Sequence, residues 1–402
     1  MVILRKRGGM LRRFNTFFMA PFWGRGFRPF FFMGALYSVL SIALWGAFYA
    51  GIGGVMPPSF FVGPVSWHAH EMIYGFSMAI VAGFLLTAVA NWTGGAPARQ
   101  FHLAGLCALW LAGRVVMGID MGLPTWAIIL LEVSFVPAVA VSLSIPLLKS
   151  WNKRNFIFLT LLSALFACDL WFCLSGNLQA LYAAMMIILM MVSLIGGRII
   201  PAFTVAALRQ RGIMAFQTEQ MKMDVAALVS LIAVTVSLLF APGTLFVGVT
   251  AALSCVIHAL RMRHYHTAKS IAVPLLWILH AGYGWLVIGL ALFALSGFGF
   301  FEIRLVVHAL TAGCIGSMIL GMICRVTLGH TGRELRVGKW VVAAFCAIQV
   351  AAIMRVFGPM LWPAETNNWI IYSALIWAAC FAIYLAVYSR MLFAPRPDGQ
   401  AA

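Results

Sequence analysis

Trp67-His68-Ala69-His70-Glu71 opens an apolar run that continues to Asn91. A helix needs about 20 apolar residues to cross the roughly 30 Å hydrocarbon core of a bilayer, and this run is long enough. Ionisable side chains are costly to bury in lipid, so two imidazoles and a carboxylate at the start of such a helix indicate a functional site. Imidazole is also the most common protein ligand for transition metals and haem iron. We therefore expect a helical membrane protein with a metal site near this point.

The rest of the 402-residue chain has the same character, because 63% of its residues are hydrophobic and only 9% are charged. Soluble globular proteins do not have this composition, and outer-membrane barrels use alternating strands of about 10 residues instead of long apolar runs. We predict an all-α polytopic membrane domain over residues 29–392, between a basic segment (1–28) and a short tail (393–402). Its twelve predicted spans are 29–51, 68–91, 101–119, 122–148, 155–174, 178–200, 224–240, 244–261, 271–296, 303–327, 338–358 and 367–392.

The net charge of +17 is explained by topology. If the N-terminus is cytoplasmic, all 27 Lys and Arg residues except Arg114, Arg304 and Arg355 fall in inner loops, tails or span ends. Lys and Arg concentrate on the cytoplasmic side of membrane proteins. We therefore expect both termini to be cytoplasmic, the lipid bilayer to be the main partner, and no nucleic-acid partner.

Small or polar residues recur every four positions along the second span, at Glu71, Gly75, Ala79, Gly83, Thr87 and Asn91. Residues four apart share one face of a helix. Small side chains on a face allow close approach of another helix or of a flat cofactor, and the sequence leaves both interpretations open.

His68 and His70 are two residues apart, so on a regular helix their side chains point about 200° away from each other. They can share one metal only if the helix has not yet begun at this point. Otherwise they serve two sites, or one binds a metal while the other forms a hydrogen bond. A third interpretation is a pair of interfacial histidines beside Trp67 in an aromatic belt.

Other ionisable residues fall at similar depths in other spans. At 1.5 Å per residue, His308 lies about 8 Å below the outer surface and His280, in a span that starts inside, about 15 Å deep. Arg114 and Asp169 fall in the outer half, and Glu132 lies near the middle. We therefore expect one outer-leaflet group, with Glu132 and His280 just below it.

This group matches the needs of a metal or haem pocket. We predict His68, His70, His280 and His308 as metal and cofactor ligands, and Arg114 as a partner for a haem propionate. Glu71 and Glu132 are candidate catalytic residues, as proton relays or as carboxylates that orient the ligands. A proton or substrate pathway would need much the same set of residues.

Several segments, in order along the chain from about 28 to 392, resemble the NnrS family. They are Arg28-Pro29-Phe30-Phe31, residues 67–76, Gly83-Phe84-Leu85-Leu86-Thr87-Ala88, Asn91-Trp92-Thr93-Gly94, residues 196–204, the His280 segment, His308-Ala309-Leu310-Thr311, and residues 327–333. The resemblance implies a twelve-span protein of the bacterial inner membrane with haem, expected to be b-type, and copper. It also implies a connection with denitrification and the response to nitric oxide.

The chain departs from the family pattern at two places. After Phe-Thr the family usually has an x-Asn-Ala-Leu run, whereas this chain has Val205-Ala206-Ala207-Leu208 and so lacks the Asn. In addition, Cys173 stands where many members have His. If that His is a ligand, Cys173 is a soft substitute or the site is altered.

The leading functional hypothesis is a haem- and copper-binding protein that binds or reduces nitric oxide, and a reductase would need electrons from quinol or a protein partner. One rival is a secondary transporter, because an inner loop over about 201–223 divides the spans six and six. The other rival is an assembly factor that transfers haem or copper to another enzyme.

Overall fold

The structure is a computed structural model that describes residues 17–52 and 60–400. It confirms the all-α fold: the described residues contain 12 helices long and apolar enough to cross a membrane. Residues 1–16, which form most of the predicted basic N-terminal segment, lie outside the described residues. All twelve predicted spans are present, because within lipid a helix satisfies its own backbone hydrogen bonds and an apolar run favours it.

The first six spans comprise α2 (Phe27–Tyr49), α3 with η2 and α4 (Pro64–His70, Glu71–Ser77 and Met78–Thr93), α5 (Gln100–Gly118), α6 with α7 (Thr125–Val133 and Phe135–Lys149), α8 (Ile157–Ser175) and α9 (Leu178–Gln210). The last six comprise α10 (Met221–Phe240), α11 (Leu245–Met262), α13 (Pro274–Gly297), α14 with η4 and α15 (Ile303–His308, Ala309–Ile315 and Gly316–His330), α16 (Lys339–Leu361) and α17 (Thr366–Phe393). Short helices η1 (Pro21–Trp23), η3 (Lys153–Asn155), α12 (Thr267–Ser270) and η5 (Pro363–Glu365) lie between or beside them.

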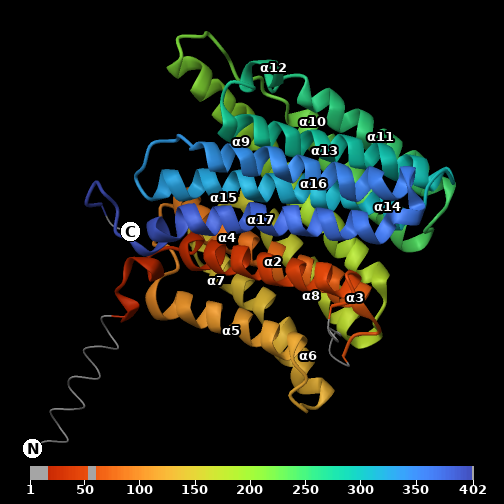
Figure 1. The fold of residues 1–402 in the computed structure, drawn as a ribbon. Helices are drawn as coiled ribbons and strands as arrows, with labels where there is room; N and C mark the ends of the chain where they lie inside the picture. The colour runs from red at the N-terminus through yellow and green to blue at the C-terminus, as the bar shows by residue number, and fades with distance from the viewer. Residues whose placement is uncertain (1–16, 53–59, 401–402) are drawn as a thin grey trace, which may run out of the picture.

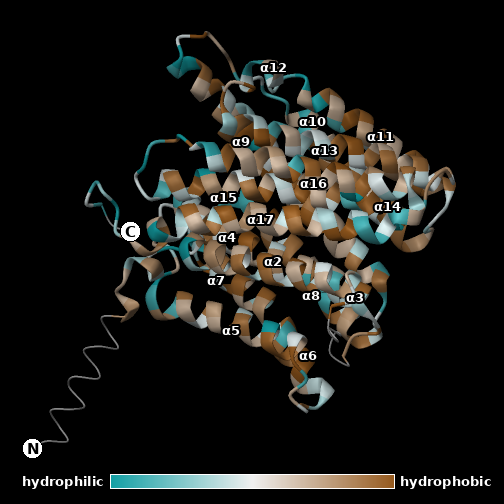
Figure 2. Cartoon of the chain, viewed as in Figure 1, coloured by the Kyte–Doolittle hydropathy of each residue, from teal (hydrophilic) through white to brown (hydrophobic). Residues whose placement is uncertain are grey.

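The long helices lie side by side in one bundle (Figure 1). The start of α2 and the C-terminal residues lie at one end, which we call the termini end, and α3 and α14 lie at the other, the distal end. Apolar residues cover most of the long helices, and polar residues gather in the loops and at the helix ends (Figure 2). Helix α3, which carries His68 and His70, and helix α14, which carries His308, therefore lie at the same end of the bundle.

Two spans contain a π-helical segment, and each segment begins directly after a histidine. His70 ends α3 before η2, and His308 ends α14 before η4. Such segments account for well under 1% of residues in proteins and occur frequently at functional sites. The two π-helical segments therefore point to the same two histidines that the sequence analysis selected.

The sixth span is longer than predicted. The prediction ended it at Ile200 because proline follows, but α9 continues through Pro201 to Gln210, which shortens the loop before α10 to residues 211–220. Proline is tolerated in membrane helices when neighbouring groups satisfy the freed backbone. Pro201 leaves the Gly197 carbonyl without its helical N–H donor, and α9 nevertheless continues for nine more residues.

The small-residue face of the second span packs against α2, which confirms the helix-packing interpretation for its glycines. A Cβ atom placed on Gly83 would lie 2.8 Å from the Phe30 Cβ, and one on Gly75 would lie 2.4 Å from the Tyr37 ring. Further along the same face, the Thr87 hydroxyl accepts a hydrogen bond from the Phe27 N–H, at 2.9 Å. A helix, and not a cofactor, fills this face at Gly75 and Gly83.

We expect Gly83→Leu to destabilise the protein by about 1–3 kcal/mol, because overpacking forces neighbouring side chains and backbone to move. Gly105→Leu is the matched control, since a Cβ atom on Gly105 would meet no atom within 4 Å. The measurement is the thermal unfolding midpoint of each purified variant in detergent. Equal midpoints for the two variants would contradict this packing of the second span against α2.

Candidate metal centres

His68 and His70 serve two different places in the structure. Helix α3 begins at Pro64, so both residues are helical and their side chains point to nearly opposite sides. The His68 ring stacks on the Trp45 indole at 4.1 Å, whereas His70 is completely buried and faces α8. The structure therefore excludes one metal shared by these two side chains, and the other interpretations stay predictions.

His70 is held between two carboxylates. Its Nδ1 lies 2.9 Å from Glu71 Oε1, and its Nε2 lies 3.1 Å from Asp169 Oδ1. A neutral imidazole carries one N–H and can donate to only one of them. If Nδ1–H donates to Glu71, the Nε2 lone pair is free to bind a metal, and this is how metal-binding histidines are usually oriented in proteins.

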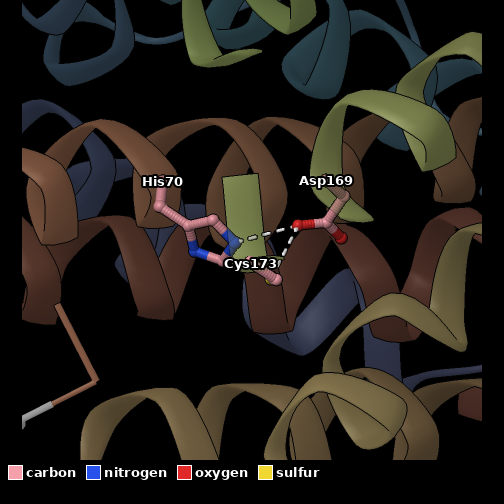
Figure 3. Close-up of side chains that lie close together, drawn as sticks. All are labelled: His70, Asp169 and Cys173. Atoms are coloured by element: carbon pink, nitrogen blue, oxygen red, sulfur yellow. Dashed lines mark hydrogen bonds and ion pairs between the residues drawn. The ribbon is translucent and has the colours of Figure 1, made fainter. Parts of the chain in front are cut away.

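Cys173 completes a group with three kinds of donor atom. One ligand atom each from His70, Asp169 and Cys173 lie within 4.8 Å of one another, and all three residues are buried (Figure 3). Asp169 and Cys173 are four residues apart in α8 and therefore share one helix face. We call this group the His70 site. Nitrogen, oxygen and sulfur donors together suit a transition metal such as copper or zinc.

Arg114 connects Glu71 to Glu132. Its Nη1 donates to Glu71 at 2.5 Å and its Nη2 donates to Glu132. The Tyr37 hydroxyl also donates to Glu71. Gly113 is necessary for this arrangement, because a Cβ atom there would lie 2.7 Å from a Glu132 oxygen.

The cluster carries more negative than positive charge. Glu71, Glu132 and Asp169 are at most 3% exposed, and Arg114 is the one arginine that pairs with any of them among the described residues. Buried charge must be compensated, so at least one further positive charge is required, as a proton on His70 or a carboxylate, or as a metal ion. The charge balance therefore favours a cation at this place.

A small cavity opens next to the His70 site at the distal end. It has a volume of about 170 Å³ and is lined by Phe60, Phe61, Val62, Ser66, Phe172, Cys173, Ser175 and Gly176. Val62 is largely exposed, and Cys173 belongs to the buried ligand group. The cavity therefore leads from the distal surface to the donor atoms and has room for a small molecule.

His68 and His308 lie at a second candidate site. We call these two residues and Arg355 of α16 the His68 site. The two imidazoles lie near each other, and Arg355 is the charged neighbour of both. His308 Nδ1 is buried without a hydrogen-bond partner in the described part of the chain. Arg355 pairs with none of the described carboxylates. The site thus offers an unused imidazole nitrogen and an unpaired positive charge.

His280 is not brought together with the other three histidines. A Cβ atom on Gly321 would contact Ile278 and Leu279, so His280 lies at about the same depth as Gly321. Gly321 follows His308 by 13 residues in the tenth span, which corresponds to about 20 Å along that helix. Its Nε2 lies 2.9 Å from the Thr204 hydroxyl and its Nδ1 lies 3.1 Å from the Thr267 hydroxyl. A metal would have to replace one of these bonds, and the ligand role of His280 stays a prediction.

Two residues at these sites, Tyr37 and Arg355, were not predicted from the sequence. Tyr37 contacts Glu71 from α2, and Arg355 lies beside His68 and His308. Arg355 had one signal in the sequence, since it is a cation in an apolar span that the inner-loop pattern did not explain. Nothing in the sequence around Tyr37 distinguishes it from an ordinary aromatic residue of a membrane helix.

The chain was compared with known proteins. No curated protein matches it. A family model described as NnrS protein matches residues 21–396, which is nearly the whole chain, and this range includes both sites. The chain therefore belongs to the NnrS family.

Proposed function

We propose that this protein binds haem and copper in the bacterial inner membrane and acts in nitric oxide metabolism or in the response to nitric oxide stress. Membership of the NnrS family supports the connection with nitric oxide. The observation that carries the proposal is the buried His70 site, where an imidazole, a carboxylate and a thiol converge in a cluster with excess negative charge. Both sites lie toward the distal end, which the distribution of basic residues assigns to the outer half of the membrane.

We assign copper to the His70 site. Imidazole suits copper in both of its common oxidation states, and a thiolate favours Cu(I). Cys173 is therefore the soft substitute for the histidine that many family members have at this position. A copper ion would also supply the positive charge that Glu71, Glu132 and Asp169 require.

We assign haem to the His68 site. His68 and His308 come from two different spans, as expected for residues that hold a haem between helices, and Nδ1 of His308 has no hydrogen-bond partner among the described residues. Arg355 is the unpaired cation that a haem propionate needs. Arg114, which we first expected in that role, has both Nη atoms bound to carboxylates, and its contact with a propionate stays a prediction.

Bound iron and copper would supply ligation and electron transfer for a diatomic molecule such as nitric oxide. The protein's own groups then have separate tasks. Glu71 accepts from His70 Nδ1–H and fixes the ring, so that Nε2 points toward Asp169 and Cys173. Glu132 Oε2 and Asp169 Oδ2 are buried with no hydrogen-bond partner in the described chain, so either atom can hold a proton beside the metal. The 170 Å³ cavity admits a small ligand.

We expect the two cofactors to be lost independently. His68→Ala and His308→Ala should lose haem and keep copper, whereas His70→Ala and Cys173→Ser should lose copper and keep haem, because the two sites share no side chain. The measurement is the Soret absorbance and the copper content of each purified variant. His264→Ala and His266→Ala are controls, since both residues lie in the loop between α11 and α13 and should leave both cofactors in place.

Equal loss of both cofactors in all four site variants would contradict the assignment of separate sites. His280→Ala belongs in the same series, and loss of either cofactor would confirm the ligand role that the sequence predicted for it. Wild-type protein without a Soret band and without copper, purified from haem- and copper-replete cells, would contradict the proposal and favour the secondary transporter.

We expect Glu71→Gln to weaken copper binding about 10–100-fold, because carboxylates that orient a metal-binding histidine contribute this much. The measurement is a copper titration of the reduced protein against a competing chelator. Glu334→Gln is the control, since Glu334 is an exposed loop residue at the termini end. Full copper affinity in Glu71→Gln, together with slower nitric oxide turnover, would instead assign Glu71 to proton transfer.

We expect nitric oxide to shift the Soret band of the reduced wild-type protein if one of His68 and His308 binds the iron and leaves the other side free, because nitric oxide is a strong ligand of ferrous haem. Two histidine ligands would make this shift slow or absent. Consumption of nitric oxide with added quinol would then distinguish a reductase, which needs an electron donor, from a protein that only binds the gas. A protein that contains both cofactors but does not respond to nitric oxide would favour the assembly factor.

A further inference from the structure

Two segments that the sequence analysis selected have no role in the proposed function, and they meet at the termini end. Arg28-Pro29-Phe30-Phe31 begins α2, and Gly329-His330-Thr331-Gly332-Arg333 ends α15. His330 connects them to the C-terminal tail. Its Nδ1 accepts from Arg25 Nη1 at 3.3 Å, and its carbonyl accepts from Arg396 Nη1 at 3.1 Å. These two contacts bring Arg25 and Arg396 together. Arg28 follows Arg25 by three residues, and Arg333 follows His330 by three residues.

Arg28 is completely buried, and part of its guanidinium is unused. Its Nη1 donates to the carbonyls of Leu392, at 2.7 Å, and Ala394, at 2.8 Å, where α17 ends. Its Nε and Nη2 are buried and have no hydrogen-bond partner among the described residues. Leaving buried charged donors unpaired is costly. Two nitrogens of Arg28, which carry three N–H groups, therefore lack an acceptor among the described residues.

The positive charge around Arg28 is also incompletely balanced. Arg25, Arg333 and Arg396 all act electrostatically on Arg28. The one carboxylate nearby, Asp398, is already bound to Arg396, at 2.9 and 2.5 Å. Burial lowers the pKa of Arg25, and the neighbouring charge of Arg396 lowers it further. Four arginines and one carboxylate leave a surplus of three positive charges at this place.

We infer that Arg25, Arg28, Arg333 and Arg396 form a binding site for a phosphate group. The planar guanidinium donates paired N–H groups that match phosphate oxygens, and a dianion or two phosphodiester groups would neutralise most of the surplus charge. The cluster lies where α2, α15 and α17 reach the termini end of the bundle. Basic pockets between membrane helices on the cytoplasmic side bind the head groups of anionic phospholipids. A lipid headgroup and free phosphate share this chemistry, and the experiment below separates them.

Apolar side chains beside the cluster suit the lipid as the source. Phe393 ends α17 with 48% of its surface exposed, and its ring stacks on that of Phe22 at 4.3 Å. Phe22 and Phe393 are close in sequence to Arg25 and Arg396 respectively. The arrangement combines aromatic rings at membrane-interface depth with cations beside them, as expected where a lipid headgroup is held.

The test is native mass spectrometry of the full-length protein, released from mild detergent after removal of bound lipid. The probes are phosphatidylglycerol, phosphatidylcholine and inorganic phosphate. Arg333→Gln removes one cation of the cluster, whose guanidinium has a hydrogen bond to the Thr331 carbonyl. Arg336→Gln is the matched control in the same loop, since Arg336 is 86% exposed and pairs with exposed Glu334. Arg28→Gln is avoided because Arg28 also holds the end of α17.

We expect saturable binding of phosphatidylglycerol in preference to phosphatidylcholine. Arg333→Gln should weaken this binding roughly tenfold, as expected for the loss of a charged hydrogen bond, and Arg336→Gln should leave it unchanged. Saturable binding of inorganic phosphate with the same response to the variants would identify free phosphate as the source. Arg25→Gln is a second variant, to be used if Arg333→Gln unfolds at a lower temperature than the wild type. Absence of binding by both anionic probes, or equal affinities in the cluster and control variants, would overturn the inference.

Discussion

The arrangement of the distal half depends on the cost of placing charge inside a membrane. Glu71, Arg114 and Glu132 come from three different spans and are nearly inaccessible, so each is tolerable only beside the others. Their pairing determines how α5 and α6 lie against the start of the second span. Gly113 provides the space that lets Glu132 approach. The same network holds His70 through Glu71, so the ion pairs that hold these helices together also orient the candidate metal ligand.

Helix geometry places two centres next to each other without letting them share a ligand. His68 and His70 are separated by one residue, and α3 is helical at both, so the side chains enter different environments. One environment is polar, buried and rich in carboxylates. The other contains an indole, a second imidazole and an unpaired guanidinium. Hard and soft donors in the first environment and imidazoles in the second suit different cofactors.

The two ends of the bundle differ in charge. The buried carboxylates Glu71, Glu132 and Asp169 lie toward the distal end, and the arginine cluster around Arg28 lies at the termini end. This asymmetry agrees with the expected orientation, in which basic residues remain on the cytoplasmic side. It also separates the proposed tasks, since the proposed metal centres lie near one end of the bundle and the proposed phosphate site lies at the other. Aromatic and apolar side chains fill most of the space between them.

Much of the fold could be predicted from local sequence, because a bilayer requires each span to be long, apolar and helical by itself. Spans therefore appear at nearly the predicted positions, and the main error is the end of the sixth span, which continues through Pro201 to Gln210. Depth along each helix also follows from residue count, which is why His70, Glu71, Arg114 and Glu132 were grouped correctly. The family could likewise be identified from its motifs.

Contacts between spans could not be predicted in this way, since depth says nothing about which helices are neighbours or which faces meet. Only the tertiary structure paired His68 with His308 and Arg355, brought Cys173 to His70, and placed the glycines of the second span against α2. It also set His280 apart from His68, His70 and His308, because α13 begins at Pro274 and its neighbour at that level is Gly321. Depth is a property of one helix and can be read from its sequence, whereas a binding site is a property of several helices and depends on how their side chains pack.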